Sequence, residues 1–202
     1  KEFSSTVGLG SRTYSFLGNG KIATQYHTMG ESQLSIVDAM TGEVTSVQSP
    51  YVSIGDVVST DERVYFVGAT TVSGSEIVEY SNGQFTTIRP NKSPAEFEGY
   101  ISEPEGITYK NPKGQDTYAF YYAPKNPDYR PLEGETPPLI VKVHGGPIGA
   151  TSSSYNVGIQ FWTSRGFAVV DVNYGGSTGY GRGYRQRLNG QWGVTDVEDC
   201  VN

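Results

Sequence analysis

The sequence predicts two parts: short antiparallel strands of a partial β-propeller over residues 1–92, then an α/β domain with a mostly parallel sheet over residues 93–202. Three observations lead to this prediction. The first half repeats itself at a spacing near forty residues, the second half holds two compact apolar runs that end in glycines, and a helix-like stretch separates those runs.

The repeat predicts the blades. Its matching pairs are KIATQY and RVYFVG, QLSIVD and EIVEYS, and TGEVTSV and NGQFTTI, whose members start 42, 43 and 41 residues apart. About four short strands per unit, with a glycine at a hairpin, is typical of propeller blades, and two blades do not close a ring. A single β-sandwich with accidental self-similarity is the alternative. The polar segment RPNKSPAEFEG at 89–99, with its two prolines, marks the domain junction.

The second half changes pattern after this junction. GITYKN and DTYAFYYAP alternate like half-buried strands, whereas PPLIVKVHGG and GFAVVDVNYGG are compact like buried parallel strands. A helix is expected from Tyr155 to Arg165, with Val157 and Phe161 on one side, and Gly166 ends it. Strand, helix and strand form a βαβ unit, whose ligand chemistry is expected at the carboxyl ends of the strands.

Composition excludes several classes of protein and site. The net charge of −6 does not favour nucleic acid as a partner. One cysteine and two histidines provide no metal-ligand spacing and no internal disulfide, so neither a metal nor another cofactor is expected. The sequence lacks a long apolar run and an apolar signal segment, which predicts a cytoplasmic protein without membrane contact.

Ser177 lies in a literal G-x-S-x-G motif, the pattern of a nucleophile elbow, directly after the run FAVVDVNY. An elbow needs a helix that begins at the serine, but three glycines follow within a few residues, and each costs about 1 kcal/mol in helix propensity. No histidine follows Ser177 in the chain to act as its base. A turn residue is therefore favoured, and an esterase that uses Ser177 is the alternative.

The motif HGGP at 144–147 is more informative, because glycines after a strand let a backbone N–H approach a reacting carbonyl. With FWTSRGFAVVDVNYGGSTGYGRGYR and NGQWGVTDVEDCVN behind it, the series resembles the catalytic domain of the prolyl oligopeptidase family of serine peptidases, especially its bacterial acylaminoacyl-peptidase and dipeptidyl-peptidase-like members. The resemblance is strong over 138–202 and moderate over 93–137. It implies propeller blades followed by the N-terminal part of an α/β-hydrolase domain.

The resemblance also implies site residues and substrates. It gives Gly146 as a backbone donor of the oxyanion hole, and it puts His144 where some relatives have a tyrosine that donates to the same oxygen. By the family pattern, the nucleophile, acid and histidine follow Asn202, so the chain is expected to be a truncated and inactive piece of a peptidase for short peptides. A homo-oligomeric state stays open.

Two other function classes compete. The glycines after VVDVNY do not form G-x-G-x-x-G, which argues against a nucleotide-binding protein. A non-catalytic interaction module of propeller and sheet fits residues 1–202 taken alone. Several polar and aromatic residues are assigned structural or solvent-exposed roles without a part in catalysis: a solvated basic face, acidic residues at a helix start, solvated carboxylates and a core tryptophan. They are Arg182, Arg185 and Arg187; Asp196, Glu198 and Asp199; Glu31, Asp56, Asp61 and Glu62; and Trp192.

Overall fold

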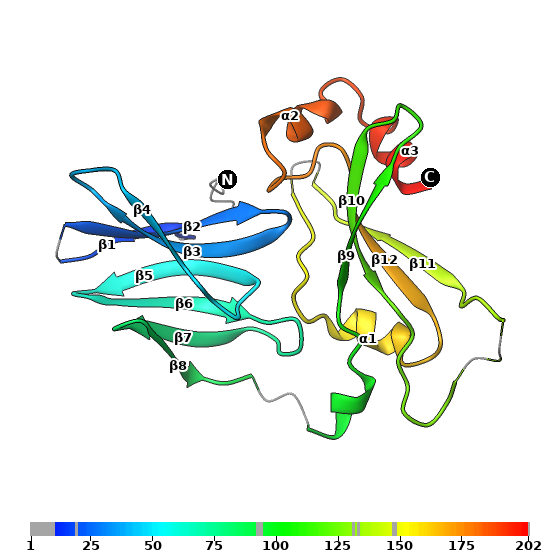
Figure 1. Cartoon of the computed structure of the whole chain (residues 1–202), viewed down its shortest axis with the longest axis horizontal. Coiled ribbons are helices and arrows are strands. Elements are labelled where there is room, and N and C mark those ends of the chain that lie inside the picture. The colour runs from blue at the N-terminus through cyan, green and yellow to red at the C-terminus, as the bar shows by residue number, and fades with distance from the viewer. Residues whose placement is uncertain are drawn as a thin grey trace.

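Two four-stranded antiparallel sheets form the first part of the chain in the computed structural model (Figure 1). The structure describes residues 11–18, 20–91, 95–130, 132, 134–146 and 149–201. Strands follow one another in sequence order within each sheet. The first sheet holds β1 (Tyr14–Phe16), β2 (Lys21–Thr28), β3 (Glu31–Asp38) and β4 (Val44–Val47), and the second holds β5 (Ser53–Thr60), β6 (Arg63–Ala69), β7 (Glu76–Ser81) and β8 (Gln84–Arg89).

The sequence repeat maps onto these sheets, because its paired segments fall on β2 and β6, on β3 and β7, and on β4 and β8. The two sheets share one apolar cluster, in which Leu34, Val57 and Val78 are fully buried. Hairpins Met29–Gly30 and Asn82–Gly83 have positive φ at both residues, as a two-residue turn between twisted strands requires. The blade pattern expected from the repeat is therefore present. The domain boundary at residue 92 stays a prediction.

The second part is built on a mixed sheet of order β11–β12–β10–β9. Its strands are β9 (Glu105–Lys110), β10 (Asp116–Tyr122), β11 (Leu139–Val143) and β12 (Ala168–Asn173), and a 3-10 helix, η1 (Ala95–Tyr100), precedes them. Only the β11–β12 pair is parallel, whereas β10 pairs antiparallel with both β9 and β12. The prediction of a mostly parallel sheet is thus met only in part, because the alternating strands before β11 join the same sheet as a hairpin.

Helix α1 (Val157–Thr163) connects β11 to β12 and is shorter than the predicted stretch 155–165. Asn156 caps its start by accepting hydrogen bonds from the amides of Gly158 and Ile159. The structure buries Ile159, Gln160 and Thr163, whereas Val157, which the sequence places on one side with Phe161, is 73% exposed. A helix of seven residues buries too narrow a stripe for apolar periodicity to identify its inner face.

Three short helices follow β12: α2 (Arg182–Arg185), η2 (Gln186–Leu188) and α3 (Thr195–Val201). Helix α2 begins at Arg182, directly after Gly181, and includes Gly183. The expectation that the helix begins only after the third glycine is therefore wrong. These helices gather near one end of the mixed sheet, and α1 lies beside the sheet (Figure 1). Within the described residues no helix has the length and apolar character needed to cross a bilayer.

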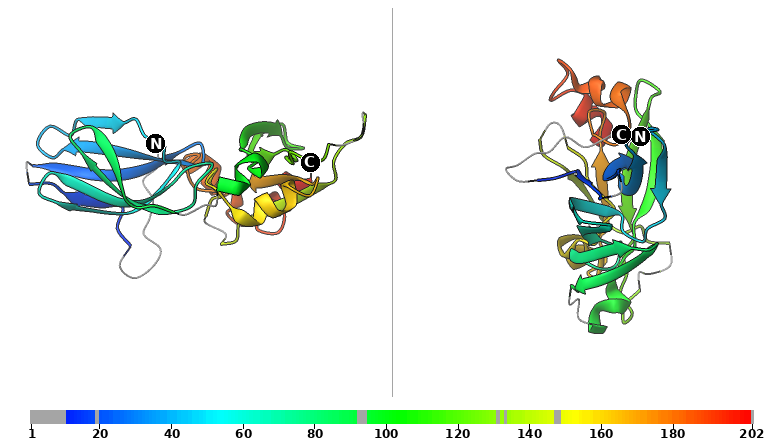
Figure 2. Two further views of the ribbon diagram at one scale, coloured as in Figure 1. Left: turned by 90° about the horizontal axis from the view of Figure 1, so that it is seen from below. Right: turned by 90° about the vertical axis from the view of Figure 1, so that its left-hand side faces the viewer.

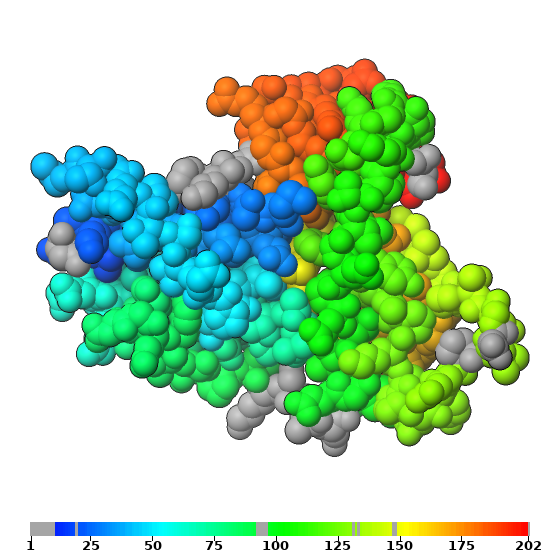
Figure 3. Space-filling model, viewed as in Figure 1, coloured from blue at the N-terminus to red at the C-terminus, as the bar shows by residue number. Residues whose placement is uncertain are grey.

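The blades and the mixed sheet form two lobes that meet in the middle of the molecule (Figures 2 and 3). The β2–β3 hairpin supplies part of this contact. The amide of Met29 donates to the carbonyl of Gly179 at 3.1 Å, and Gly30 is buried against Tyr180 and Phe120.

Gly30→Ala is expected to weaken this contact more than a matched change elsewhere. A Cβ at Gly30 would lie 2.6 Å from the Tyr180 hydroxyl and 3.1 Å from the Phe120 ring, whereas Gly83, which has nearly the same φ, has open space around it. Both substitutions strain the backbone by about 1 kcal/mol. Gly30→Ala adds a clash worth about 1–3 kcal/mol. Equal midpoints for the two variants in urea unfolding would contradict this assignment.

Candidate functional site

The parallel pair β11 and β12 brings two glycine-rich loops together. Val143 of β11 is the register partner of Val172 of β12, so the two strands end side by side. His144 follows β11 directly, and the segment 174–181 follows β12. Motifs that the sequence separates thereby meet at the carboxyl end of the strands, where α/β sheets collect their chemistry.

His144 holds these two loops together. Its Nε2 lies 2.7 Å from the Ser177 hydroxyl and its Nδ1 lies 3.0 Å from the Gly145 carbonyl. Because a carbonyl only accepts, Nδ1 carries the proton and Nε2 accepts from Ser177. The imidazole also stacks on Tyr174 at 4.4 Å between ring centroids. The histidine is therefore fixed in position and tautomer.

Burial lowers the pKa of His144 below its ordinary value of 6.5. The Gly145 carbonyl and the nearby charge of Asp171 act in the opposite direction, and Lys142 adds a smaller lowering effect. His144 is therefore neutral at neutral pH, as an acceptor at Nε2 must be.

Gly146 is exposed in this loop and has a φ of 140°, which L side chains rarely adopt. Among the described residues, none accepts a hydrogen bond from its amide. An exposed glycine beside the end of a parallel strand, whose N–H has no acceptor among the described residues, is a candidate donor to a ligand oxygen.

The segment after Gly146 is tied to β12 and the loop behind it. Gly149 accepts from the amide of Thr178 at 2.8 Å. The Asn173 side chain accepts from the Thr151 amide at 2.8 Å and donates to the Thr151 carbonyl at 3.0 Å. These three bonds fix the path from the glycine loop toward α1.

A half-buried ion pair lies below this segment. Asp171 is 1% exposed, forms an ion pair with the 40% exposed side chain of Lys142 on the neighbouring strand, and accepts from the Thr151 hydroxyl at 2.6 Å. Removing Lys142 would leave the buried carboxylate of Asp171 without its cation. Sequence reasoning missed Thr151, Asp171 and Asn173, because nothing in their local pattern distinguishes them from ordinary strand and loop residues.

Ser177 has a histidine partner after all, which corrects the argument that it lacks a base: the partner precedes it in the chain instead of following it. Ser177 is nevertheless 0% exposed, and its own amide donates to the carbonyl of Tyr174. The second nitrogen of His144 faces a neutral carbonyl where a catalytic triad has a carboxylate. A buried hydroxyl cannot reach a substrate carbonyl, so this geometry favours a structural role.

The structural and solvent-exposed roles that the sequence suggested for other residues are correct in some cases and wrong in others. Asp196 and Glu198 do lie in the first turn of α3, but Asp199 is fully buried and accepts from the Gly175 amide at 2.7 Å. Arg187 is no freely solvated charge, since it stacks over Tyr184 and donates to the carbonyl of Asp116. The prediction that Trp192 anchors the core is wrong, because its side chain is 67% exposed.

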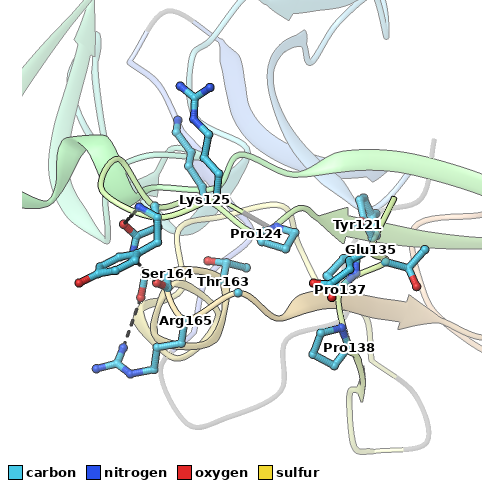
Figure 4. A pocket seen from close by; sticks show the side chains of 14 residues that line it. Tyr121, Pro124, Lys125, Glu135, Pro137, Pro138, Thr163, Ser164 and Arg165 are labelled. Carbon is cyan, nitrogen blue, oxygen red and sulfur yellow. Dashed lines mark hydrogen bonds between the residues drawn. The ribbon is translucent and has the colours of Figure 1, made fainter. Parts of the chain in front are cut away.

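A cavity of about 870 Å³ lies elsewhere, at the amino ends of β11 and β12 (Figure 4). Lys125, Arg130 and Arg165 line it together with Glu135 and three prolines. Arg165 is already engaged there, because it stacks over Phe161 and donates to the Phe161 carbonyl. In the described residues no group of three metal-ligating side chains is present, here or elsewhere.

A family model for the prolyl oligopeptidase family matches residues 153–202, which include β12, its following loop and the Asn173 and Ser177 contacts. Over these residues the chain is similar to the prolyl oligopeptidase family. The resemblance seen in the sequence is thereby confirmed, and the matched prolyl oligopeptidase segment is the half of the site that holds His144 and the glycine loop in place.

Known proteins extend this similarity. The chain is 38% identical over 65 residues to a dipeptidyl aminopeptidase BIII of Pseudoxanthomonas mexicana, covering 32% of this chain and 9% of that protein. It is 38% identical over 68 residues to an acylamino-acid-releasing enzyme of Arabidopsis thaliana, covering 34% and 9%. A solved puromycin-hydrolyzing peptidase of Mycobacterium tuberculosis superposes with a TM-score of 0.91 at 35% identity, covering 99% of this chain and 32% of that one. The chain thus spans about a third of this solved relative.

The His144–Ser177 contact predicts a measurable titration. The pKa of His144 should lie below 6.5, and Ser177→Ala should raise it, because the lost hydroxyl donates only to the neutral imidazole. The pKa of His144 is lower in the folded chain than in the unfolded chain, where it is about 6.5. The contact therefore stabilises the loop fully above pH 6.5, and this stability is lost as the pH falls from 6.5 toward the pKa of the folded chain. Proton NMR of the chain and of a His27→Gln variant, which leaves one histidine signal, checks both shifts. An unchanged His144 titration in Ser177→Ala would refute the contact.

Proposed function

We propose that the whole protein is a serine peptidase of the prolyl oligopeptidase family that cleaves short peptides by acyl transfer, and that this chain contributes propeller blades and the start of its α/β-hydrolase domain. One observation carries the proposal. Gly146 is exposed and lies just past the carboxyl end of a parallel strand, in a loop held by a segment that matches the family.

Gly146 would donate its N–H to the oxygen that becomes negative as the peptide carbonyl turns tetrahedral. One such donor is worth a factor of about 10²–10³ in rate, because it is already oriented when the charge forms. His144 would not serve as the base of the triad, since its Nε2 is occupied by Ser177. Its part would be to hold the glycine loop, while a serine, an acid and a second histidine, which the family pattern places after Asn202, would perform the bond exchange.

Small substrates are favoured because the blades lie against the same loops. The β2–β3 hairpin contacts Gly179 and Tyr180, close behind Ser177 in the chain. A propeller at this position would limit access and exclude folded proteins. The named activities of the relatives, dipeptidyl aminopeptidase and acylamino-acid release, are consistent with peptide substrates and leave open the choice between free and blocked N-termini.

An esterase that uses Ser177 is the competing activity, and the 2.7 Å contact with His144 is the one observation in its favour. We expect the isolated 202-residue chain to show no such activity, because the Ser177 hydroxyl is buried. A fluorophosphonate probe and an activated ester should leave the purified chain unlabelled and should give no burst of product. Burst release that disappears in Ser177→Ala would establish the esterase and overturn the turn-residue assignment.

The peptidase proposal predicts size selection by the whole protein. A peptide of about ten residues should be cleaved at least about 100-fold faster than a folded protein that carries the same sequence in an exposed loop. Steady-state rates on the two substrates, with the unfolded form of the second protein as control, measure this ratio. Equal rates would show that the blades do not restrict entry, and absence of cleavage of a broad set of short peptides would remove the peptidase assignment itself.

A further inference from the structure

Glu31 connects the first blade to the segment that follows the glycine loop. It is the first residue of β3, directly behind the Met29–Gly30 turn. Its Oε1 accepts a hydrogen bond from the hydroxyl of Ser153 at 2.7 Å, and Ser153 is 2% exposed. The sequence suggested a solvated carboxylate at this position, whereas the structure gives it a partner across the two parts of the chain.

A second blade contact lies two residues further along the same segment. The amide of Tyr155 donates at 2.8 Å to the carbonyl of Thr70, which follows β6. Both blades therefore hold residues 153–155 just before α1 begins. The turn at Gly30 is packed at close range against Tyr180, which fixes the backbone of the hairpin that carries Glu31.

The same segment is held from its other side by the mixed sheet. Gly149 is bonded to Thr178, and Thr151 is bonded to Asn173. Residues 149–155 are thus fixed between the blades and the end of β12. Gly149 also packs against the residues before Gly146, because a Cβ at Gly149 would lie 3.1 Å from the Gly145 carbonyl oxygen and 3.2 Å from Nδ1 of His144. Fixing one backbone residue costs about 1–2 kcal/mol in conformational entropy, so these bonds have to act together to hold a loop of this length.

We propose that Glu31 is a positioning residue for the glycine loop: through Ser153 the first blade sets the position of the Gly146 amide. This inference rests on the proposed function of Gly146. A carboxylate acceptor makes a hydrogen bond about twice as strong as a neutral one. Displacement of a positioning group by about 1 Å can lower a rate by about 10²-fold.

The first test uses hydrogen–deuterium exchange on the 202-residue chain and is independent of catalysis. Glu31→Ala and Ser153→Ala should each speed exchange in residues 149–155 by about tenfold, since local opening then breaks fewer bonds. Glu31→Gln should stay near wild type, because its amide oxygen still accepts from Ser153. Glu43→Ala, an exposed carboxylate on the same blade, is the matched control. Unchanged exchange in both alanine variants would refute the positioning role of the Glu31–Ser153 contact, whatever the protein catalyses.

The second test uses steady-state kinetics of the whole protein on a short peptide. Positioning predicts that Glu31→Ala and Ser153→Ala each lower kcat about tenfold with little change in KM, that the double variant is no worse than either single one, and that Glu31→Gln restores most of the rate. If Glu31 instead binds the substrate's amino group, Glu31→Gln raises KM as much as Glu31→Ala does and Ser153→Ala is near normal, which overturns the proposal. An inactive wild type with the expected exchange pattern would count against the proposed function, but it would still support the Glu31–Ser153 contact as the bond that positions residues 149–155.

Discussion

The buried side chain of Asn173 is the constraint on which the site depends. It lies at the last position of β12, is fully buried, and uses its carboxamide to bond both the N–H and the C=O of Thr151. The same carboxamide nitrogen donates to the hydroxyl of Tyr180 at 3.0 Å. An unpaired polar group at this depth costs about 1–3 kcal/mol, so the two loops have to stay together for these groups to remain satisfied. The His144–Ser177 contact becomes available because the loops are already closed in this way.

The elements could be predicted from the sequence where the signal is local, and their partners could not. A sequence repeat near forty residues located β2 to β4 and β6 to β8, because the second blade repeats the strand pattern of the first. The strand–helix–strand pattern correctly predicted the parallel pair β11–β12. The alternation in DTYAFYYAP does not say which strand lies beside β10, so its antiparallel pairing with β12 was not predicted. The His144 contact joins residues 33 apart. Chain order suggested that Ser177 lacked a histidine, and only the parallel register of β11 and β12 brings one back to it.

Distance and burial give opposite assignments for the His144–Ser177 pair, and burial decides between them. A spacing of 2.7 Å is what a serine–histidine dyad needs, yet a nucleophile also has to meet its substrate. Ser177 has no exposed surface, whereas the residue Gly146, on the other loop, is exposed. The pair therefore has the geometry of a hydrogen-bonded clasp, which leaves Gly146 as the proposed donor to a substrate oxygen in this part of the chain.

The contacts of residues 149–155 couple the glycine loop to the blades. Bonds from Ser153 and Tyr155 reach the first and second blades, while bonds from Gly149 and Thr151 reach the end of β12. A rotation of the blades away from the sheet would have to break the Glu31 and Thr70 bonds or pull this segment along. Because Gly149 packs against His144 and Gly145, the second outcome would also disturb the loop that carries Gly146.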